Sequence, residues 1–115
     1  VSDSAVGIDI QEKRRYEPAL AKRFFAPEEC IRIECSSDKD ETFTLIWSAK
    51  EAVLKFLGTG LKRGLSSVHI IDETVAVVLP ENLHLSLRYF IADNFAICLC
   101  AEKLDDMIDF RLVEL

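Results

Sequence analysis

The sequence has no long run of apolar residues. None of its apolar stretches approaches the roughly 20 residues that a helix needs to cross a bilayer, and no signal-peptide pattern opens the chain. Hydrophobic residues make up 50% of the 115 and charged residues 30%, which is an ordinary composition for a soluble globular protein. We therefore expect one domain over residues 1–115 with a single core.

Basic residues are in the minority. There are 14 Lys and Arg against 20 Asp and Glu, so the net charge is −6, which argues against a nucleic-acid partner. The basic residues nevertheless gather in two clusters, one of Lys13, Arg14, Arg15, Lys22 and Arg23 and one of Lys62 and Arg63. Solvated surface charge and a docking site for phosphate or an acidic partner both stay open as interpretations.

The spacing of the cysteines does not match a structural zinc site. Cys30, Cys35, Cys98 and Cys100 form no C-x₂-C pair, and no histidine lies close to them in sequence. We expect reduced cysteines that serve as small apolar residues, which indicates a reducing, cytoplasmic setting. A zinc-binding or purely scaffolding domain is the most distant alternative.

The N-terminal segment alternates apolar and polar residues and predicts a strand over residues 6–11. We expect Val6, Ile8 and Ile10 to face the core. The interleaved polar residues, Asp9 and Gln11, then share the opposite face with Gly7.

Helical patterns follow this strand. Residues 17–35 are typical of a broken helix in which Pro18 and Pro27 each begin a turn. Between residues 41 and 57 the apolar positions follow a helical period, which Gly58 ends. This second helix is the strongest element that the sequence predicts.

Beyond Gly64 the apolar pattern changes to period two. The expected strands cover residues 68–71, 75–79, 83–91, 95–101 and 110–115. The alternation is typical of an antiparallel sheet with one buried face. The predicted fold class is α+β, with helices packed on an antiparallel sheet.

Polar residues of the first strand and the long helix suggest a metal site. Asp9 and Gln11 point the same way from the strand, about 7 Å apart. A hard cation such as Mg²⁺ needs oxygen ligands from more than one element, and Glu51 is a candidate from the helix. Lys50 and Lys55 flank Glu51, and the combination suits a metal-bridged pyrophosphate.

Simpler interpretations of the same residues stay open. Asp9 fits the polar side of an exposed strand equally well. Glu51 and Lys55 fit a surface ion pair worth about 0.3–0.5 kcal/mol. Trp47 is more often a core residue than the wall of a substrate site.

Four ordered motifs resemble the signature series of the 4′-phosphopantetheinyl transferase superfamily. They are Val6-Gly7-Ile8-Asp9-Ile10, Arg23-Phe24-Phe25 with Glu29, Trp47-Ser48-Ala49-Lys50-Glu51-Ala52-Val53-Leu54-Lys55, and Gly58-Thr59-Gly60-Leu61. The tryptophan before the Lys-Glu pair resembles the Sfp-type branch more than the short acyl-carrier-protein synthase branch. The similarity covers nearly the whole chain and resembles the C-terminal half of the pseudo-dimeric Sfp-type enzyme.

The resemblance implies a Mg²⁺-dependent transferase. It would move 4′-phosphopantetheine from coenzyme A to a serine of an acyl or peptidyl carrier protein and release 3′,5′-ADP. Glu29 would lie near the reacting centre, where it would assist the serine proton or organise water. The implied residues are Asp9, Gln11 and Glu51 as Mg²⁺ ligands, Lys50 and Lys55 on the coenzyme A phosphates, and Glu51, Lys55 and Glu29 in catalysis.

Two departures from the family pattern stand out. Gln11 occupies a position where most Sfp-type members carry glutamate, so a metal bound there would have one anionic ligand fewer and a lower affinity. The first half of the enzyme, which usually supplies the adenine pocket and contacts to the 3′-phosphate, has no counterpart here. The partners implied are that half or a second copy, with a carrier protein at residues 13–15 and the following helices. A non-catalytic half-domain that binds a carrier or another partner is the alternative.

Overall fold

The computed structural model describes residues 6–58 and 64–102. Its elements are β1 (Val6–Glu12), α1 (Pro18–Phe24), α2 (Pro27–Glu34), α3 (Lys39–Leu57), the 3₁₀ helix η2 (Leu65–Ser67), β2 (Val68–Ile70), β3 (Val75–Val78), β4 (Leu83–Ala92) and β5 (Phe95–Ala101). The strand predicted at 110–115 lies outside the described residues, as do Gly60, Lys62 and Arg63. None of the helices described is long and apolar enough to cross a membrane.

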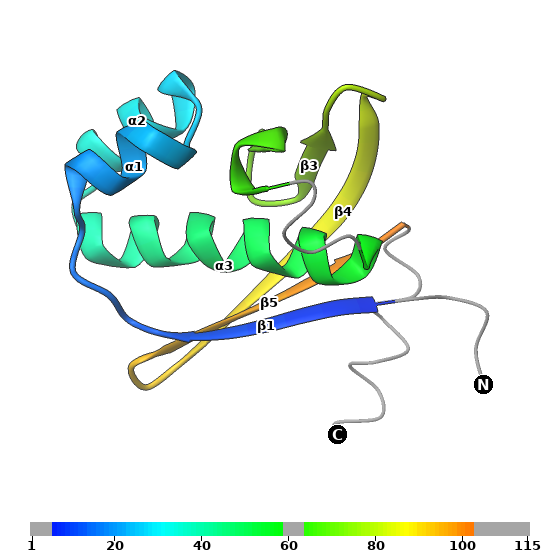
Figure 1. Cartoon of the computed structure of the whole chain (residues 1–115). Coiled ribbons are helices and arrows are strands. Elements are labelled where there is room, and N and C mark those ends of the chain that lie inside the picture. The colour runs from blue at the N-terminus through cyan, green and yellow to red at the C-terminus, as the bar shows by residue number, and fades with distance from the viewer. Residues whose placement is uncertain (1–5, 59–63, 103–115) are drawn as a thin grey trace.

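The strands form one antiparallel sheet in the order β1-β5-β4-β3-β2. In Figure 1, α3 lies along the sheet between β1 and β5 on one side and α1 and α2 on the other. The α+β prediction, with helices packed on an antiparallel sheet, is confirmed.

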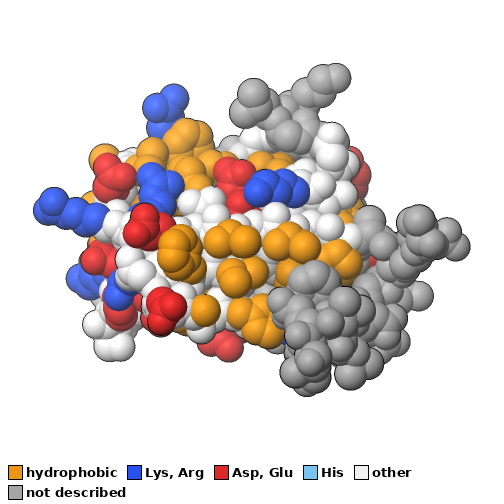
Figure 2. All heavy atoms as spheres, turned by 90° about the horizontal axis from the view of Figure 1, so that it is seen from below, with side chains coloured by type: hydrophobic (Ala, Val, Ile, Leu, Met, Phe, Trp, Pro, Cys, Tyr) orange, Lys and Arg blue, Asp and Glu red, His pale blue; other side chains and the backbone are white. Residues whose placement is uncertain are grey.

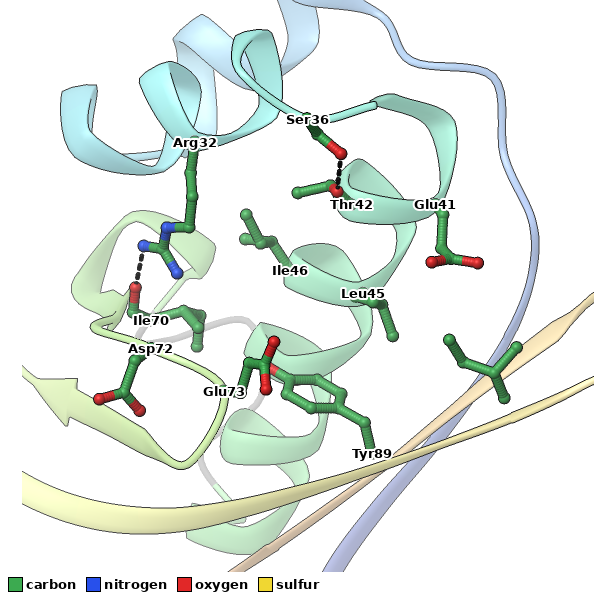
Figure 3. Close-up of a pocket in the computed structure, with 11 residues that line it drawn as sticks. Arg32, Ser36, Glu41, Thr42, Leu45, Ile46, Ile70, Asp72, Glu73 and Tyr89 are labelled. Carbon is green, nitrogen blue, oxygen red and sulfur yellow. Dashed lines mark hydrogen bonds between the residues drawn. The ribbon is translucent and has the colours of Figure 1, made fainter. Parts of the chain in front are cut away.

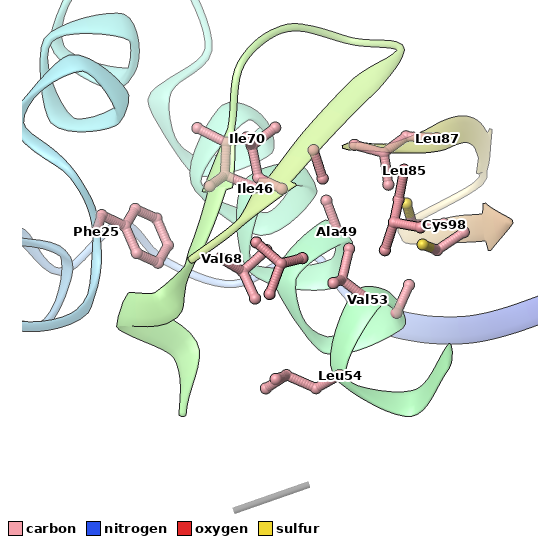
Figure 4. Packing of buried hydrophobic residues seen from close by; sticks show 14 of the residues in the cluster. Phe25, Ile46, Ala49, Val53, Leu54, Val68, Ile70, Leu85, Leu87 and Cys98 are labelled. Carbon is pink, nitrogen blue, oxygen red and sulfur yellow. The ribbon is translucent and has the colours of Figure 1, made fainter. Parts of the chain in front are cut away.

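The core lies between α3 and the sheet. Phe43, Ile46 and Val53 of α3 are buried there, as the helical period predicted. They share one cluster with Leu87 of β4 and Cys98 of β5 (Figure 4). Cys98 and Cys100 are buried and free, and burial raises the pKa of the Cys100 thiol to about 12, so these two serve as small apolar residues as expected, whereas Cys35 is exposed.

Both ends of α3 carry the residues that helix ends favour. The Asp38 carboxylate accepts a hydrogen bond from the backbone N–H of Glu41 at 3.0 Å, which caps the N-terminus. Gly58 ends the helix in the left-handed region, at φ 70°, where a glycine is least strained. The predicted end of the helix is therefore confirmed.

The predicted orientation of β1 is wrong. Ile8 and Ile10 are 38% and 58% exposed, whereas Gly7 and Asp9 face α3 and are buried. A Cβ atom on Gly7 would lie 2.1 Å from the Ala52 carbonyl oxygen, so the helix backbone approaches β1 more closely than any side chain would allow. The strand alternates as expected, but the close helix contact selects the face that carries glycine.

Candidate functional site

Two carboxylates meet where β1 contacts α3. Asp9 is buried on the strand, and Lys55 of the helix donates a hydrogen bond from Nζ to Asp9 Oδ1 at 2.8 Å. Glu51 lies one turn before Lys55. Burial, and secondarily the charge of Asp9, raise the pKa of the Glu51 carboxyl. The residues therefore form a partly desolvated group with two carboxylates and one ammonium.

Further hydrogen bonds fix Asp9 in place. Gln11 donates from Nε2 to Asp9 Oδ2 at 2.9 Å, so the predicted shared face of these two residues is confirmed. The Ser48 hydroxyl of α3 donates to the Asp9 backbone carbonyl at 3.3 Å. Gln11 thus acts as a donor to Asp9 in this arrangement, and its side chain holds the carboxylate on the side opposite Lys55.

A cavity of about 610 Å³ opens beside this group. Glu51 and Lys55 supply its charged side chains. The remaining lining residues are Phe24, Leu54, Gly58, Gly64 and Leu65. The cavity is therefore suited to a ligand that has an anionic end and an apolar portion.

The two carboxylates fit a divalent cation. Among residues 6–58 and 64–102, no three His, Cys, Asp or Glu side chains converge on one possible metal position. A cation bound by Asp9 and Glu51 would therefore take its other oxygen ligands from phosphate, water or an amide, as Mg²⁺ commonly does. Burial, and after it the charge of Asp9, raise the pKa of Glu51, whereas Lys55 lowers it; a bound cation would favour the ionised carboxylate as Lys55 does.

Lys50 and Glu29 lie elsewhere, in a buried ion pair. Their side chains are 0% and 1% exposed, and Lys50 Nζ is 2.9 Å from Glu29 Oε1. Lys50 also donates to the backbone carbonyls of Leu65, at 3.4 Å, and Val68. Burial lowers the pKa of Lys50, and the charge of Glu29 opposes that shift.

The contacts of Glu29 tie α2 to β2. Its carboxylate accepts the backbone N–H of Ala26 at 2.7 Å, which caps α2, and that of Ile70 at 2.6 Å. The structure thus does not bring Lys50 and Glu29 together with Asp9, Glu51 and Lys55. Because the core encloses both side chains, the structure lends no support to the phosphate contact expected of Lys50 or to the place near the reacting centre expected of Glu29, and both stay predictions.

Trp47 packs among other aromatic rings, which favours the core interpretation. Its ring centroid lies 6.0–6.3 Å from those of Phe24, Phe25 and Phe43. The guanidinium of Arg14 stacks over the indole at 4.5 Å. This aromatic cluster anchors the segment between β1 and α1 to the helix.

The main basic cluster is only partly neutralised. Lys13 pairs with Asp38 at 2.7 Å, and Arg14 lies 3.8 Å from Glu17. Arg15 and Lys22 are exposed and have no ion pair with another described residue. A free positive surface therefore remains around α1.

Comparison with known proteins gives one consistent family. The sequence model of the 4′-phosphopantetheinyl transferase superfamily matches residues 5–105. The 4′-phosphopantetheinyl transferase psf-1 of Bacillus pumilus is 39% identical over 69 residues, which are 58% of this chain and 30% of that protein. The 4′-phosphopantetheinyl transferase Sfp of Bacillus subtilis is 30% identical over 116 residues, which are 94% of this chain and 51% of that protein.

A solved structure agrees with these relatives. The holo-[acyl-carrier-protein] synthase of Thermotoga maritima superposes with a TM-score of 0.72 at 25% identity, over 84% of this chain and 61% of that one. The chain spans about half the length, or less, of the curated relatives named above. By sequence and by fold, it belongs to the 4′-phosphopantetheinyl transferase superfamily.

Proposed function

We propose that this chain provides the metal and phosphate site of a 4′-phosphopantetheinyl transferase. The enzyme moves phosphopantetheine from coenzyme A to a serine of an acyl or peptidyl carrier protein, and 3′,5′-ADP leaves. The observation that carries the proposal is the convergence of Asp9, Glu51 and Lys55 beside a cavity, within motifs that the family shares.

Asp9 and Glu51 would hold Mg²⁺ in this proposal. The bound cation would neutralise pyrophosphate oxygens, which is the main demand of phosphoryl transfer. Asp9 is already oriented by Gln11 and Ser48, so little rearrangement is needed for it to bind a cation. We assign Gln11 to this orienting role first, because its amide donates to Asp9.

Lys55 would contact the coenzyme A phosphates. Its side chain is 54% exposed although its ammonium pairs with Asp9, so it can turn toward a phosphate oxygen once a cation binds the carboxylate. Phosphopantetheine has an anionic end and a less polar arm. The cavity offers Lys55 to the first and Leu54 and Leu65 to the second.

The open face of the sheet would pack against the other half of the enzyme. Ile8 and Ile10 lie on this face beside Ile97 and Phe95 of β5, and Figure 2 shows apolar side chains gathered there. An apolar face of this kind is typical of an interaction surface. We propose that this chain is the C-terminal half of a pseudo-dimer and that the face takes an N-terminal half or a second copy.

A carrier protein would dock on the free positive surface around α1. Arg15 and Lys22 are available for this contact, because they are exposed and lack ion pairs with described residues. Carrier proteins tend to be acidic around the modified serine, so the charges complement each other. The four free cysteines agree with a reducing, cytoplasmic setting for this reaction.

A transfer assay tests the proposal. Apo carrier protein, coenzyme A and Mg²⁺ are incubated with this chain, or with a full-length enzyme if the chain alone is inactive, and mass spectrometry detects the modified serine. We expect transfer that chelation of the metal abolishes. Binding of coenzyme A or carrier protein without any transfer would instead support the alternative, a non-catalytic interaction module.

A further inference from the structure

Strand β4 extends well beyond its neighbour β3. Pairing between them covers only Leu83 to Ser86 of β4. The Leu87 N–H then donates to the Thr74 carbonyl at 2.8 Å, and no later β4 residue has a partner on this side within the described chain. Because backbone groups alternate along a strand, the N–H and C=O of Tyr89 and Ile91 point to the same side as those of Leu87.

This free edge borders a groove. A cavity of about 580 Å³ lies between the edge and the helices α2 and α3 (Figure 3). Tyr89 and Ile91 of β4 line the cavity, and Leu45 and Ile46 of α3 line it from the helix side. Arg32 of α2 closes one end, with its guanidinium donating to the Ile70 carbonyl.

We propose that this edge and groove bind an extended, basic peptide segment of a partner protein as an added strand. Exposed edges are normally blocked by lysine, proline or a bulge, because open backbone groups invite pairing. Tyr89 and Ile91 supply none of these blocks. With α3 over one side, the edge admits a single narrow chain more readily than a second sheet.

The geometry sets the length of the bound segment. The unpaired part of β4, Arg88 to Ala92, spans about 17 Å at roughly 3.4 Å per residue. A segment of about five residues would run antiparallel to β4. It would continue the line of β3 beyond Thr74, where the pairing of β3 with β4 ends. Its alternate side chains would enter the groove beneath α3.

The charges of the groove select a basic occupant. Three acidic residues, Glu41, Asp72 and Glu73, line it together with one basic residue, Arg32, and none of the three forms an ion pair with any described residue. Asp72 accepts hydrogen bonds from the backbone N–H groups of Thr74 and Val75, which lower its pKa and keep it anionic. Lysine or arginine would place its ammonium or guanidinium on these carboxylates and its aliphatic stem on Leu45 and Ile46.

This site is separate from the proposed transfer site. The groove uses the first turns of α3, around Glu41 to Ile46, whereas Glu51 and Lys55 lie on its last turns. The inference therefore does not depend on the proposed function. It assigns a binding role to a part of the fold that the transfer reaction leaves unused.

Nuclear magnetic resonance can test the proposal with a defined probe. A capped peptide of about six residues that alternates lysine and valine is titrated into the ¹⁵N-labelled chain. We expect shifts centred on the amides of Tyr89 and Ile91 and slower hydrogen exchange at both. Shifts that spare these amides would overturn the proposal.

Matched controls separate strand addition from other binding. Two N-methylated versions of the peptide are compared, one methylated at the odd residues and one at the even residues. Only one of them loses the N–H groups that face the β4 edge, and that peptide should bind about tenfold more weakly. The double substitution Glu41→Gln and Glu73→Gln should also weaken binding several-fold, while Glu12→Gln on β1 should not. Equal affinity of both methylated peptides and the parent peptide, or of a peptide with glutamate for lysine, would contradict the proposal.

Discussion

Two ion pairs on α3 involve lysines five residues apart, yet they lie in opposite environments. Lys50 and Glu29 are 0% and 1% exposed, whereas Lys55 is 54% exposed beside Asp9 at 3%. Five residues carry an α-helix about 140° past a full turn. The two ammonium groups therefore leave the helix on different sides, one into the core and one toward the cavity.

The comparison shows how one helical motif serves two purposes. A fully buried pair has lost its hydration and depends on close geometry, so neither partner is free to contact a substrate. A half-exposed pair keeps its lysine mobile and can exchange one anion for another. Lys50 thus holds α2 and β2 against the helix, and Lys55 is the lysine available for phosphate.

The largest expected effect is the loss of transfer when the Glu51 carboxylate, beside the cavity, is removed. Glu51→Gln takes away one of the two anionic ligands, so transfer should fall by about a hundredfold or more. The fold should survive, because Glu51 is only partly buried. Labelled phosphopantetheine transfer by this chain, or by a full-length enzyme if the chain alone is inactive, measures the loss, with Glu41→Gln on the same helix as control. Near-normal transfer at ordinary Mg²⁺ would contradict the assignment.

Coenzyme A should bind weakly to this chain alone. With Lys50 enclosed in the core, Lys55 is the remaining lysine of the motif for the phosphates, and the contacts expected from an N-terminal half are missing. Each charge-assisted contact contributes roughly 1.5–3 kcal/mol, so the loss of two or three lowers affinity by orders of magnitude.

Calorimetry with coenzyme A and Mg²⁺, together with light scattering, separates weak binding from self-association. If the chain forms a homodimer that binds coenzyme A more tightly than the monomer does, the second copy would be taking the place of the N-terminal half. Micromolar binding by a monomer would show that this chain carries a complete site by itself and would contradict its assignment as half of a pseudo-dimer.

Stability should distinguish the two lysines. Lys50→Met leaves the Glu29 charge buried without its partner and should lower the free energy of unfolding by about 3–5 kcal/mol. Lys55→Met should cost less, since the Lys55 side chain is 54% exposed and Gln11 still donates a hydrogen bond to the buried Asp9 carboxylate. Urea denaturation followed by circular dichroism gives both values. Equal losses in the free energy of unfolding would contradict the distinction between a structural Lys50–Glu29 pair and a functional Lys55–Asp9 pair.

The smallest effect concerns Gln11. In Gln11→Glu the side chain no longer donates to Asp9, and the added charge repels it until a cation binds. The Mg²⁺ concentration at half-maximal transfer should fall several-fold. A midpoint that is unchanged or higher would indicate a site adapted to the neutral amide.

Much of the fold could be predicted from periodicity, but which face of a strand is buried could not. The alternation of β1 was evident, yet it could not show that α3 contacts the side with Gly7 instead of the side with Ile8 and Ile10. Apolar residues are tolerated on the open face, whereas a Cβ at Gly7 would collide with Ala52. Such a contact depends on tertiary packing that a single strand pattern does not contain.

The burial of Lys50 did leave a signal in the sequence. Its position falls on the stripe of Phe43, Ile46 and Val53, at spacings of three, four and three residues. A lysine on such a stripe needs a buried anion, and Glu29 provides it. The family motif predicted the nearness of Asp9 and Glu51, but it gave no way to tell which of its lysines faces the core.

Paramagnetic broadening by Mn²⁺ tests the central claim most directly. Mn²⁺ takes oxygen ligands as Mg²⁺ does and broadens nearby amide signals of the ¹⁵N-labelled chain. We predict that the signals of Asp9, Gln11 and Glu51 disappear first, that excess Mg²⁺ restores them, and that those of Glu29 are affected least. Broadening centred on Glu29, or none around Asp9 and Glu51, would contradict the division of α3 into a structural and a functional ion pair.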